Sequence, residues 1–333
     1  MSNFDVWTIA EQYDGKLKAV SFELLSRGRK LADTLGSKLV SVLIGDGVSD
    51  ESLQQLIKQG ADAVYTVQDG QLKYFVCETY ALVLEKLIQT HKPWIILAAA
   101  TSSGRTLMPY VAIKVHTGLT ADCTELDIEQ GTNNLLQTRP AIGGNIMATI
   151  KTPDHRPQLA TVRPKSSRPL AADAGRKGEI TRIPFDVKLP ARSTKVLGYR
   201  KLETESNLEE ADLVVSGGKG LKKAENFQMV HKLAKSLHAA VGASRDAVDR
   251  GWAIYPMQVG LSGKTISPKV YIAIGISGAI QHLAGIKTSE TIIAINIDPD
   301  ATLHKLADLG IVGDAFQVVP EIQKRLDAKY GAK

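Results

Sequence analysis

The sequence predicts an α/β protein with two doubly wound domains, the first carrying a β-rich extension and the second built on a parallel sheet. Short apolar runs alternate with amphipathic segments through residues 4–115 and again from residue 212 onward. This alternation is typical of parallel sheets covered by helices. Between these stretches, residues 122–163 hold short β-like runs without a helical pattern. We therefore expect one domain at residues 1–200 and another at residues 201–333.

The first domain is predicted to contain four strands joined by helices. Residues 4–10, FDVWTIA, are expected to form the first strand or an edge strand. Apolar residues then fill 39–45, 63–67 and 94–100, as in strands buried on both faces of a sheet. The predicted helices are 21–35, a segment capped by Ser49 and ended near Gly60, 74–90, and a segment from Thr101 to about Val115. We interpret the turn at 101–105 as a helix cap rather than an anion site.

The middle of the chain has a different character. The runs CTELDIE, NLLQTRPAIGG, NIMATI and QLATVRP predict an antiparallel or mixed β extension within residues 122–163. Six basic residues follow among prolines and glycines: Arg163, Lys165, Arg168, Arg176, Lys177 and Arg182. They fit a solvated crossing loop, and they also fit contact with an acidic partner surface. The charged residues 190–210 are predicted to be a linker that allows relative domain motion.

The second domain is centred on a β–α–β unit at residues 269–298. An apolar strand, Val270–Ile274, leads through G-I-S-G into a helical pattern at 279–283, and a second apolar run follows at Ile292–Ile297. Small residues let a ligand approach the backbone, and a helix N-terminus favours a phosphate. The spacing differs from the dinucleotide motif G-x-G-x-x-G, so a tight turn without a ligand is an alternative.

Further loops strengthen the prediction of a ligand. A strand at 213–216, a helix at 225–240 and a strand at 239–245 precede the central unit. Glycine-rich or polar loops follow three strands, at 216–220, 244–245 and 275–282, and a fourth such loop lies at 260–263. The carboxyl ends of parallel strands meet at one edge of a sheet. Four such loops favour a large phosphate-bearing cofactor over ordinary turns.

Composition excludes several classes of protein. The 333 residues are 44% hydrophobic and 23% charged, as in an ordinary globular protein. No apolar run reaches the length of a membrane span and the N-terminus lacks a basic signal region, so we expect no membrane insertion. Cys77 and Cys123 lie far apart and no His motif is present, which predicts a cytoplasmic protein without a metal site. A net charge of +6 with 5% aromatic residues does not indicate a nucleic-acid partner.

Four segments resemble the α subunit of electron transfer flavoproteins, the FixB family. They are DLVVSGGKGLKKAENF, GASRDAVDRGW, MQVGLSGKTISPKVYIAIGISGAIQHLAGI and IIAINIDPDA. The resemblance covers residues 210–325 and reaches the first domain through LAAATSSGRTLMPYVA and RPAIGGNIMATI. It implies that the second domain binds one FAD. It also implies a heterodimer with a β subunit that carries AMP or a second FAD, while the first domain binds no cofactor and packs on that subunit.

The resemblance also implies which residues of this chain contact FAD. Lys219, Ser244 and Arg245 would lie on contacting loops, with Arg245 near the flavin ring. The isoalloxazine would be lined by Val259, Gly260, Leu261 and Ser262. The pyrophosphate and ribityl chain would be wrapped by Ser277, Gly278, Ala279, Ile280, Gln281 and His282, with His282 near the flavin C2 carbonyl. The adenosine end would contact Asn296, Asp314 and Ala315.

Some residues depart from the family pattern. Lys219 stands where arginine is usual, Leu261 where glutamine is usual and Ser262 where threonine is usual. These changes imply a drier flavin pocket. The stretch TVRP at 161–164 is similar to the branch that contains electron-bifurcating and anaerobe-type members. A charged histidine or arginine beside the flavin would stabilise negative charge on the ring.

The resemblance implies an electron carrier with no catalytic residues, rather than an enzyme that transforms a small substrate. Acyl-CoA dehydrogenases of fatty acid β-oxidation, or other flavin dehydrogenases, would be the donors. A quinone oxidoreductase or ferredoxin would be the acceptor. An NADH-dependent bifurcating subunit is an alternative. A nicotinamide-dependent dehydrogenase fits less well, because G-x-G-x-x-G and a ribose-binding acid are missing. A redox-silent nucleotide-binding regulator would differ by lacking flavin colour.

Overall fold

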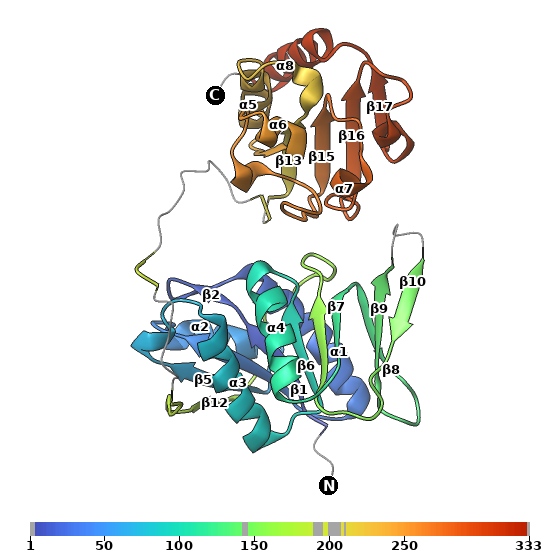
Figure 1. Ribbon diagram of the computed structural model, residues 1–333. Helices are drawn as coiled ribbons and strands as arrows, with labels where there is room; N and C mark the ends of the chain where they lie inside the picture. Colours follow the sequence, from blue (N-terminus) through green and yellow to red (C-terminus); the bar gives the residue numbers. More distant parts are fainter. Residues whose placement is uncertain (1–3, 142–145, 189–195, 199–207, 210, 332–333) are drawn as a thin grey trace. The chain divides into compact units, whose positions relative to one another are not determined.

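The computed structural model divides the chain into two compact units, Met1–Tyr199 and Arg200–Lys333 (Figure 1). It describes residues 4–141, 146–188, 196–198, 208–209 and 211–331. The predicted linker, 190–210, lies outside these ranges except for residues 196–198 and 208–209. Each unit contains a parallel sheet with packed helices, which confirms the predicted α/β class.

The first unit is organised on a seven-stranded parallel sheet with the order β12-β5-β4-β1-β6-β11-β7. The strands are β12 (Glu179–Arg182), β5 (Ala63–Gln68), β4 (Leu39–Gly45), β1 (Val6–Ala10), β6 (Ile95–Ala99), β11 (Gln158–Val162) and β7 (Leu119–Cys123). The four strands predicted for this domain are confirmed. β1 lies at the centre of the sheet rather than at an edge, since all five of its residues are buried between two helical layers.

Four helices cover this sheet on both faces. α1 (Ala19–Leu35) and α2 (Asp50–Lys58) pack on one face, and α3 (Cys77–His91) and α4 (Ser102–Lys114) pack on the other. The Ser49 hydroxyl accepts from the Ser52 amide and begins α2, and Gly60 follows its end with a φ of +124°. Thr101 caps α4 by accepting from the Gly104 amide at 3.2 Å. Side-chain caps and left-handed glycines therefore fix the helix ends where the sequence predicts them.

The predicted β extension is present but shorter. β8 (Glu125–Ile128), β9 (Leu135–Pro140) and β10 (Met147–Ile150) form an antiparallel sheet in the order β10-β9-β8. The run QLATVRP does not belong to it, because β11 lies between β6 and β7 in the main parallel sheet. Its polar residues are buried with partners: Gln158 accepts from the Leu135 amide and Thr161 accepts from the Asp122 amide, each at 2.9 Å.

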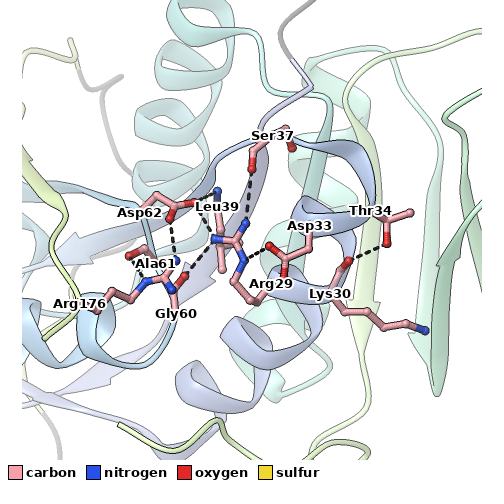
Figure 2. A network of polar contacts seen from close by, with 10 residues as sticks. All are labelled: Arg29, Lys30, Asp33, Thr34, Ser37, Leu39, Gly60, Ala61, Asp62 and Arg176. Atoms are coloured by element: carbon pink, nitrogen blue, oxygen red, sulfur yellow. Dashed lines mark hydrogen bonds and ion pairs between the residues drawn. The ribbon is translucent and has the colours of Figure 1, made fainter. Parts of the chain in front are cut away.

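Residues 163–182 are more than a solvated crossing loop, because they end in β12 and carry ion pairs to their own unit. Arg163 contacts Asp122 at 2.6 Å, and Arg182 contacts Asp50 at 2.6 Å. Arg176 joins a network around Asp62, where Arg29 and the Leu39 amide also donate to the carboxylate (Figure 2). Three of the six basic residues thus neutralise carboxylates of the first unit.

The second unit contains a five-stranded parallel sheet with the order β14-β13-β15-β16-β17. Its strands are β13 (Leu213–Gly217), β14 (Ala240–Ala243), β15 (Val270–Ile274), β16 (Thr291–Asn296) and β17 (Leu309–Val312). This is the strand order of a doubly wound sheet. β14 lies on one side of β13 and the later strands lie on the other, so the strand order reverses between β13 and β15. α5 (Phe227–Ser236), α6 (Arg245–Asp249) and α8 (Ala315–Tyr330) pack on one face. Loop side chains and α7 (Ile280–Leu283) cover the other.

Among the residues that the structure describes, no helix is both long and apolar enough to cross a bilayer.

Candidate functional site

The predicted cofactor residues follow the carboxyl ends of the strands of the second unit. Lys219 follows β13, Ser244 follows β14, and residues 275–282 follow β15. Asn296 ends β16, and Asp314 comes just after β17. Because all five strands are parallel, these positions share one edge of the sheet, next to the point where the strand order reverses.

Glycines bring the loops after β13 and β15 into direct backbone contact. The Gly220 amide donates to the Gly275 carbonyl at 2.9 Å. A Cβ on Gly218 would lie 2.4 Å from that same carbonyl oxygen. Gly278 has a φ of +86°, and a Cβ there would lie 2.5 Å from the Leu303 amide. A side chain would collide with backbone at Gly218 and Gly278, so glycine allows these loops to pack in direct contact.

The loop at 257–264 returns onto the loop after β15. The Val259 amide donates to the Ala243 carbonyl at 2.9 Å, and the Leu261 amide donates to the Gln281 carbonyl at 2.7 Å. A Cβ on Gly285 would lie 2.5 Å from the Gly260 Cα, so these backbones touch. The structure therefore brings residues 259–262 and 281–282 together, although the two groups are separated in sequence.

His282 is the most buried ionisable side chain of this set, with an exposure of 7%. Its Nε2 lies 2.8 Å from the Tyr271 hydroxyl, and its Nδ1 makes no hydrogen bond within residues 211–331. Burial lowers the pKa of His282 to about 4, while the Val259 backbone acts in the opposite direction. The imidazole is therefore neutral at pH 7 in this environment, whereas the resemblance allowed a charged one.

Arg245 supplies a positive charge at the same edge of the sheet. It begins α6 after Ser244, whose hydroxyl accepts from the Ala247 amide. Its side chain is 68% exposed and its Nε lies 3.3 Å from the Asp249 carboxylate. Such an exposed pair contributes little to stability, so Arg245 can turn toward an anionic group without a large structural cost.

The remaining predicted residues also have structural roles. Asn296 donates to the Ile276 carbonyl at 3.0 Å and ties the loop after β15 to the end of β16. Asp314 caps α8 by accepting from the Phe316 amide at 3.0 Å, and Ala315 is buried behind it. The Ser262 hydroxyl accepts from the Gln258 side chain at 3.0 Å, while Leu261 points into solvent.

The helix α7 is a single turn of four residues. A single turn aligns few peptide dipoles, so the free main-chain N–H groups at its start, more than a macrodipole, are what it offers to an anion. Sequence reasoning also overlooked Tyr271, although a tyrosine inside an apolar strand indicates a hydroxyl that needs a buried partner.

The site fits a cofactor such as FAD. It combines closely packed glycine-rich loops, an exposed arginine and a buried imidazole nitrogen without a partner among the described residues. Fold and site together define a nucleotide-cofactor-binding protein of the doubly wound α/β class.

Comparisons with known proteins specify that class. Residues 6–188 match the family model of the electron transfer flavoprotein domain, and residues 207–287 match that of the electron transfer flavoprotein FAD-binding domain. The chain is 49% identical, over 95% of its length, to the electron transfer flavoprotein subunit alpha of Thermoanaerobacterium thermosaccharolyticum and spans 96% of that protein. It belongs to the electron transfer flavoprotein α-subunit (FixB) family, and its cofactor is FAD.

Two further relatives illustrate the range of this family. Protein FixB of Clostridium saccharobutylicum is 45% identical over 95% of this chain, which spans 94% of that protein. Subunit LctC of the lactate dehydrogenase (NAD(+),ferredoxin) of Acetobacterium woodii is 39% identical over 97% of this chain, which spans 77% of that protein.

Proposed function

We propose that residues 201–333 hold the FAD and that residues 1–200 pack on a β subunit. The observation that carries the cofactor assignment is the contact between residues 259–262 and 281–282 around the buried His282. It supports a flavin ring beside the first loop and a pyrophosphate beside the second. Arg245 and Lys219 would then complement the anionic parts of the cofactor.

FAD supplies the transfer of one or two electrons when it is bound, and the chain binds and orients it. The glycine loops contribute main-chain amides, and His282 contributes an N–H donor. These groups stabilise charge on a cofactor, and none of them has to break a bond of a small substrate.

The β-rich extension offers a surface for the β subunit. β10 pairs with β9 on one side only, in the part of the sheet that the structure describes. Ile146, Met147 and Ile150 on or beside it are exposed. An edge strand with exposed apolar side chains is a hazard for a lone protein and is usually covered. The β subunit would carry AMP or a second FAD.

The electron donor that we propose is an acyl-CoA dehydrogenase or another flavin dehydrogenase, and the acceptor is a quinone oxidoreductase or ferredoxin. We propose a cytoplasmic location, in which the separated thiols of Cys77 and Cys123 stay reduced. A second candidate is a subunit of an NADH-dependent bifurcating complex. The relative named with NAD(+) and ferredoxin supports this candidate.

Anaerobic reduction of the co-purified complex of this chain and its β subunit tests the proposal. We expect the FAD absorbance to bleach when an acyl-CoA dehydrogenase and its substrate are added, and to return when the acceptor is added. Bleaching by NADH alone, with ferredoxin reduced in parallel, would establish the bifurcating alternative. A complex that binds FAD but accepts electrons from neither source would contradict both.

A further inference from the structure

Tyr271 lies in the core of the second unit with its hydroxyl against His282. It is the second residue of β15, and no part of its side chain is exposed. Its neighbours in this layer are apolar, and they include Val214, Ala273 and Ile292. A buried tyrosine hydroxyl needs a hydrogen-bond partner. Its partner is Nε2 of His282 at 2.8 Å, with ring centroids 6.0 Å apart.

Both side chains are neutral at physiological pH. Burial raises the pKa of the Tyr271 hydroxyl above its usual value, and burial lowers the pKa of His282 to about 4. One proton therefore lies between the tyrosine oxygen and Nε2, and it belongs to one of these two atoms. Either Tyr271 donates to Nε2 and the imidazole proton is on Nδ1, or Nε2–H donates to the tyrosine oxygen and Nδ1 is an acceptor.

The groups on either side of the pair favour the first arrangement. The buried Ser216 hydroxyl favours the deprotonated form of Tyr271, as a hydrogen-bond donor does. The Val259 backbone favours the protonated form of His282, as a carbonyl acceptor does. Ser216 Oγ and His282 Nδ1 are nevertheless without a hydrogen bond of good geometry in the described second unit. The 2.8 Å contact itself has a preferred polarity, because a phenolic O–H is a stronger hydrogen-bond donor than an imidazole N–H, and an imidazole nitrogen is a stronger acceptor than a phenolic oxygen.

We propose that Tyr271 is a positioning residue, whose hydroxyl donates to Nε2 and holds His282 as the Nδ1–H tautomer. Val259, which lies beside the ring, begins the loop that lines the proposed flavin site. Its remaining proton is then on the buried Nδ1, next to the backbone of that loop. This inference rests on the proposed placement of His282 at the flavin. The histidine there is neutral and has one defined tautomer instead of a positive charge.

The Tyr271→Phe variant removes the hydroxyl and keeps the ring that fills the core. Without that donor, no hydrogen bond from Tyr271 stabilises the unprotonated form of Nε2. We expect the tautomer ratio of His282 to move about tenfold toward Nε2–H, a change that corresponds to about 1.4 kcal/mol. Tyr80→Phe is the matched control. The Tyr80 hydroxyl is also buried and donates to a carbonyl, that of Leu72 at 2.8 Å, but it lies in the first unit.

Nitrogen-15 NMR of the full chain, co-purified with its β subunit and labelled at histidine, measures the tautomer directly. His282→Gln assigns the signal by its disappearance. We expect the wild-type proton on Nδ1, a redistribution in Tyr271→Phe, and no change in Tyr80→Phe. A wild-type proton on Nε2 would overturn the proposal. The wild-type spectrum therefore tests the proposal even if Tyr271→Phe does not fold. An unchanged ratio in a folded Tyr271→Phe would overturn it equally.

The same spectra separate this inference from the proposed function. Removal and return of FAD should shift the Nδ1 signal, since the cofactor is expected beside it. If the proton is on Nδ1 and the Nδ1 signal does not change when FAD is removed, Tyr271 does hold the tautomer but His282 is not at the flavin. If the tyrosine only stabilised the fold, its replacement would lower stability but would not change the tautomer ratio of His282. The tautomer measurement therefore distinguishes a positioning role from a merely structural one.

Discussion

The backbone amide of Leu261 donates a 2.7 Å hydrogen bond to the carbonyl of Gln281. This bond and the backbone contact between Gly260 and Gly285 join the two loops that are proposed to hold the flavin ring and the pyrophosphate of FAD. Because main-chain atoms make both contacts, side-chain changes at the non-glycine positions of either loop should leave this junction intact. A change that moves the backbone of one loop must instead move the other.

Gly278→Ala should loosen FAD more than an equivalent change elsewhere. Gly278 and Gly251 both have a positive φ, which costs another residue about 1–2 kcal/mol. Only at Gly278 does the new Cβ also press on backbone, 2.5 Å from the Leu303 amide, whereas nothing lies within 4 Å at Gly251. We expect Gly278→Ala to weaken FAD binding by about tenfold or more, as loss of one charged hydrogen bond would. Fluorescence titration of both variants checks this, and equal affinities would contradict it.

Asp62 should stabilise the first unit in a pH-dependent way. Its carboxylate accepts from Arg29 at 2.6 Å, Arg176 at 2.7 Å and the Leu39 amide at 2.8 Å (Figure 2). Burial raises the pKa of Asp62, but these donors and charges outweigh burial and lower the pKa overall. A lowered folded-state pKa means that the stabilisation is complete above about pH 4 and disappears as the pH falls through the folded value.

Asp62→Asn tests this network. We expect the free energy of unfolding to fall by about 1–2 kcal/mol at pH 7, since the group is partly exposed and its charge partly screened. The difference from wild type should shrink below about pH 4. Asp33→Asn is the control, because Asp33 contacts the same Arg29 from an exposed position and should matter by less than about 0.5 kcal/mol. A pH-independent loss in Asp62→Asn would show that charge is not the cause.

The sequence predicts the strands of both units well where a continuous apolar run marks the strand. Val270–Ile274 is apolar throughout, and only a strand buried on both faces explains such a run. β11 was misplaced because Gln158 and Thr161 look like surface residues. Their partners, the amides of Leu135 and Asp122, come from distant parts of the chain. Local composition does not contain that information.

The site shows the same limit. Glycine-rich loops after parallel strands could be located from spacing alone, and Arg245 with them. The contact between Tyr271 and His282 could not, since it depends on how the chain returns over the sheet after Gly275. The protonation of His282 depends in turn on that burial, so its neutral state had to come from the structure.

Ile150→Lys should weaken the association with the β subunit. Ile150 ends β10 with 41% of its surface exposed, although it is apolar. If a partner covers it, a lysine there loses about 1.5–3 kcal/mol of apolar burial, and the affinity falls by about tenfold or more. Sedimentation of mixtures with the β subunit measures this. Ile113→Lys, on the exposed side of α4, is the matched control, and an equal effect of both variants would argue against a specific role of β10.

Arg245 should tune the potential of the cofactor. A guanidinium keeps its charge at every accessible pH, so it is a fixed positive group at the edge of the site. Its pairing with Asp249 at 3.3 Å is loose and exposed, which leaves it able to face a flavin ring that gains an electron. A hydrogen bond to a charged group is worth about 1.5–3 kcal/mol, and water reduces this value when the pair is exposed.

Arg245→Ala should therefore lower the one-electron reduction potential of bound FAD by at most roughly 60–130 mV, the value without screening by water. Arg245→Lys should lower it less, because the charge remains while the planar fork is lost. FAD should stay bound in both, since the glycine loops hold the pyrophosphate elsewhere. Arg325→Ala is the control, as Arg325 has the same kind of exposed partner, Glu321 at 3.0 Å, but lies on α8. Stepwise reductive titration measures the potentials. An unchanged potential in a flavin-loaded Arg245→Ala protein would assign the tuning charge to another residue.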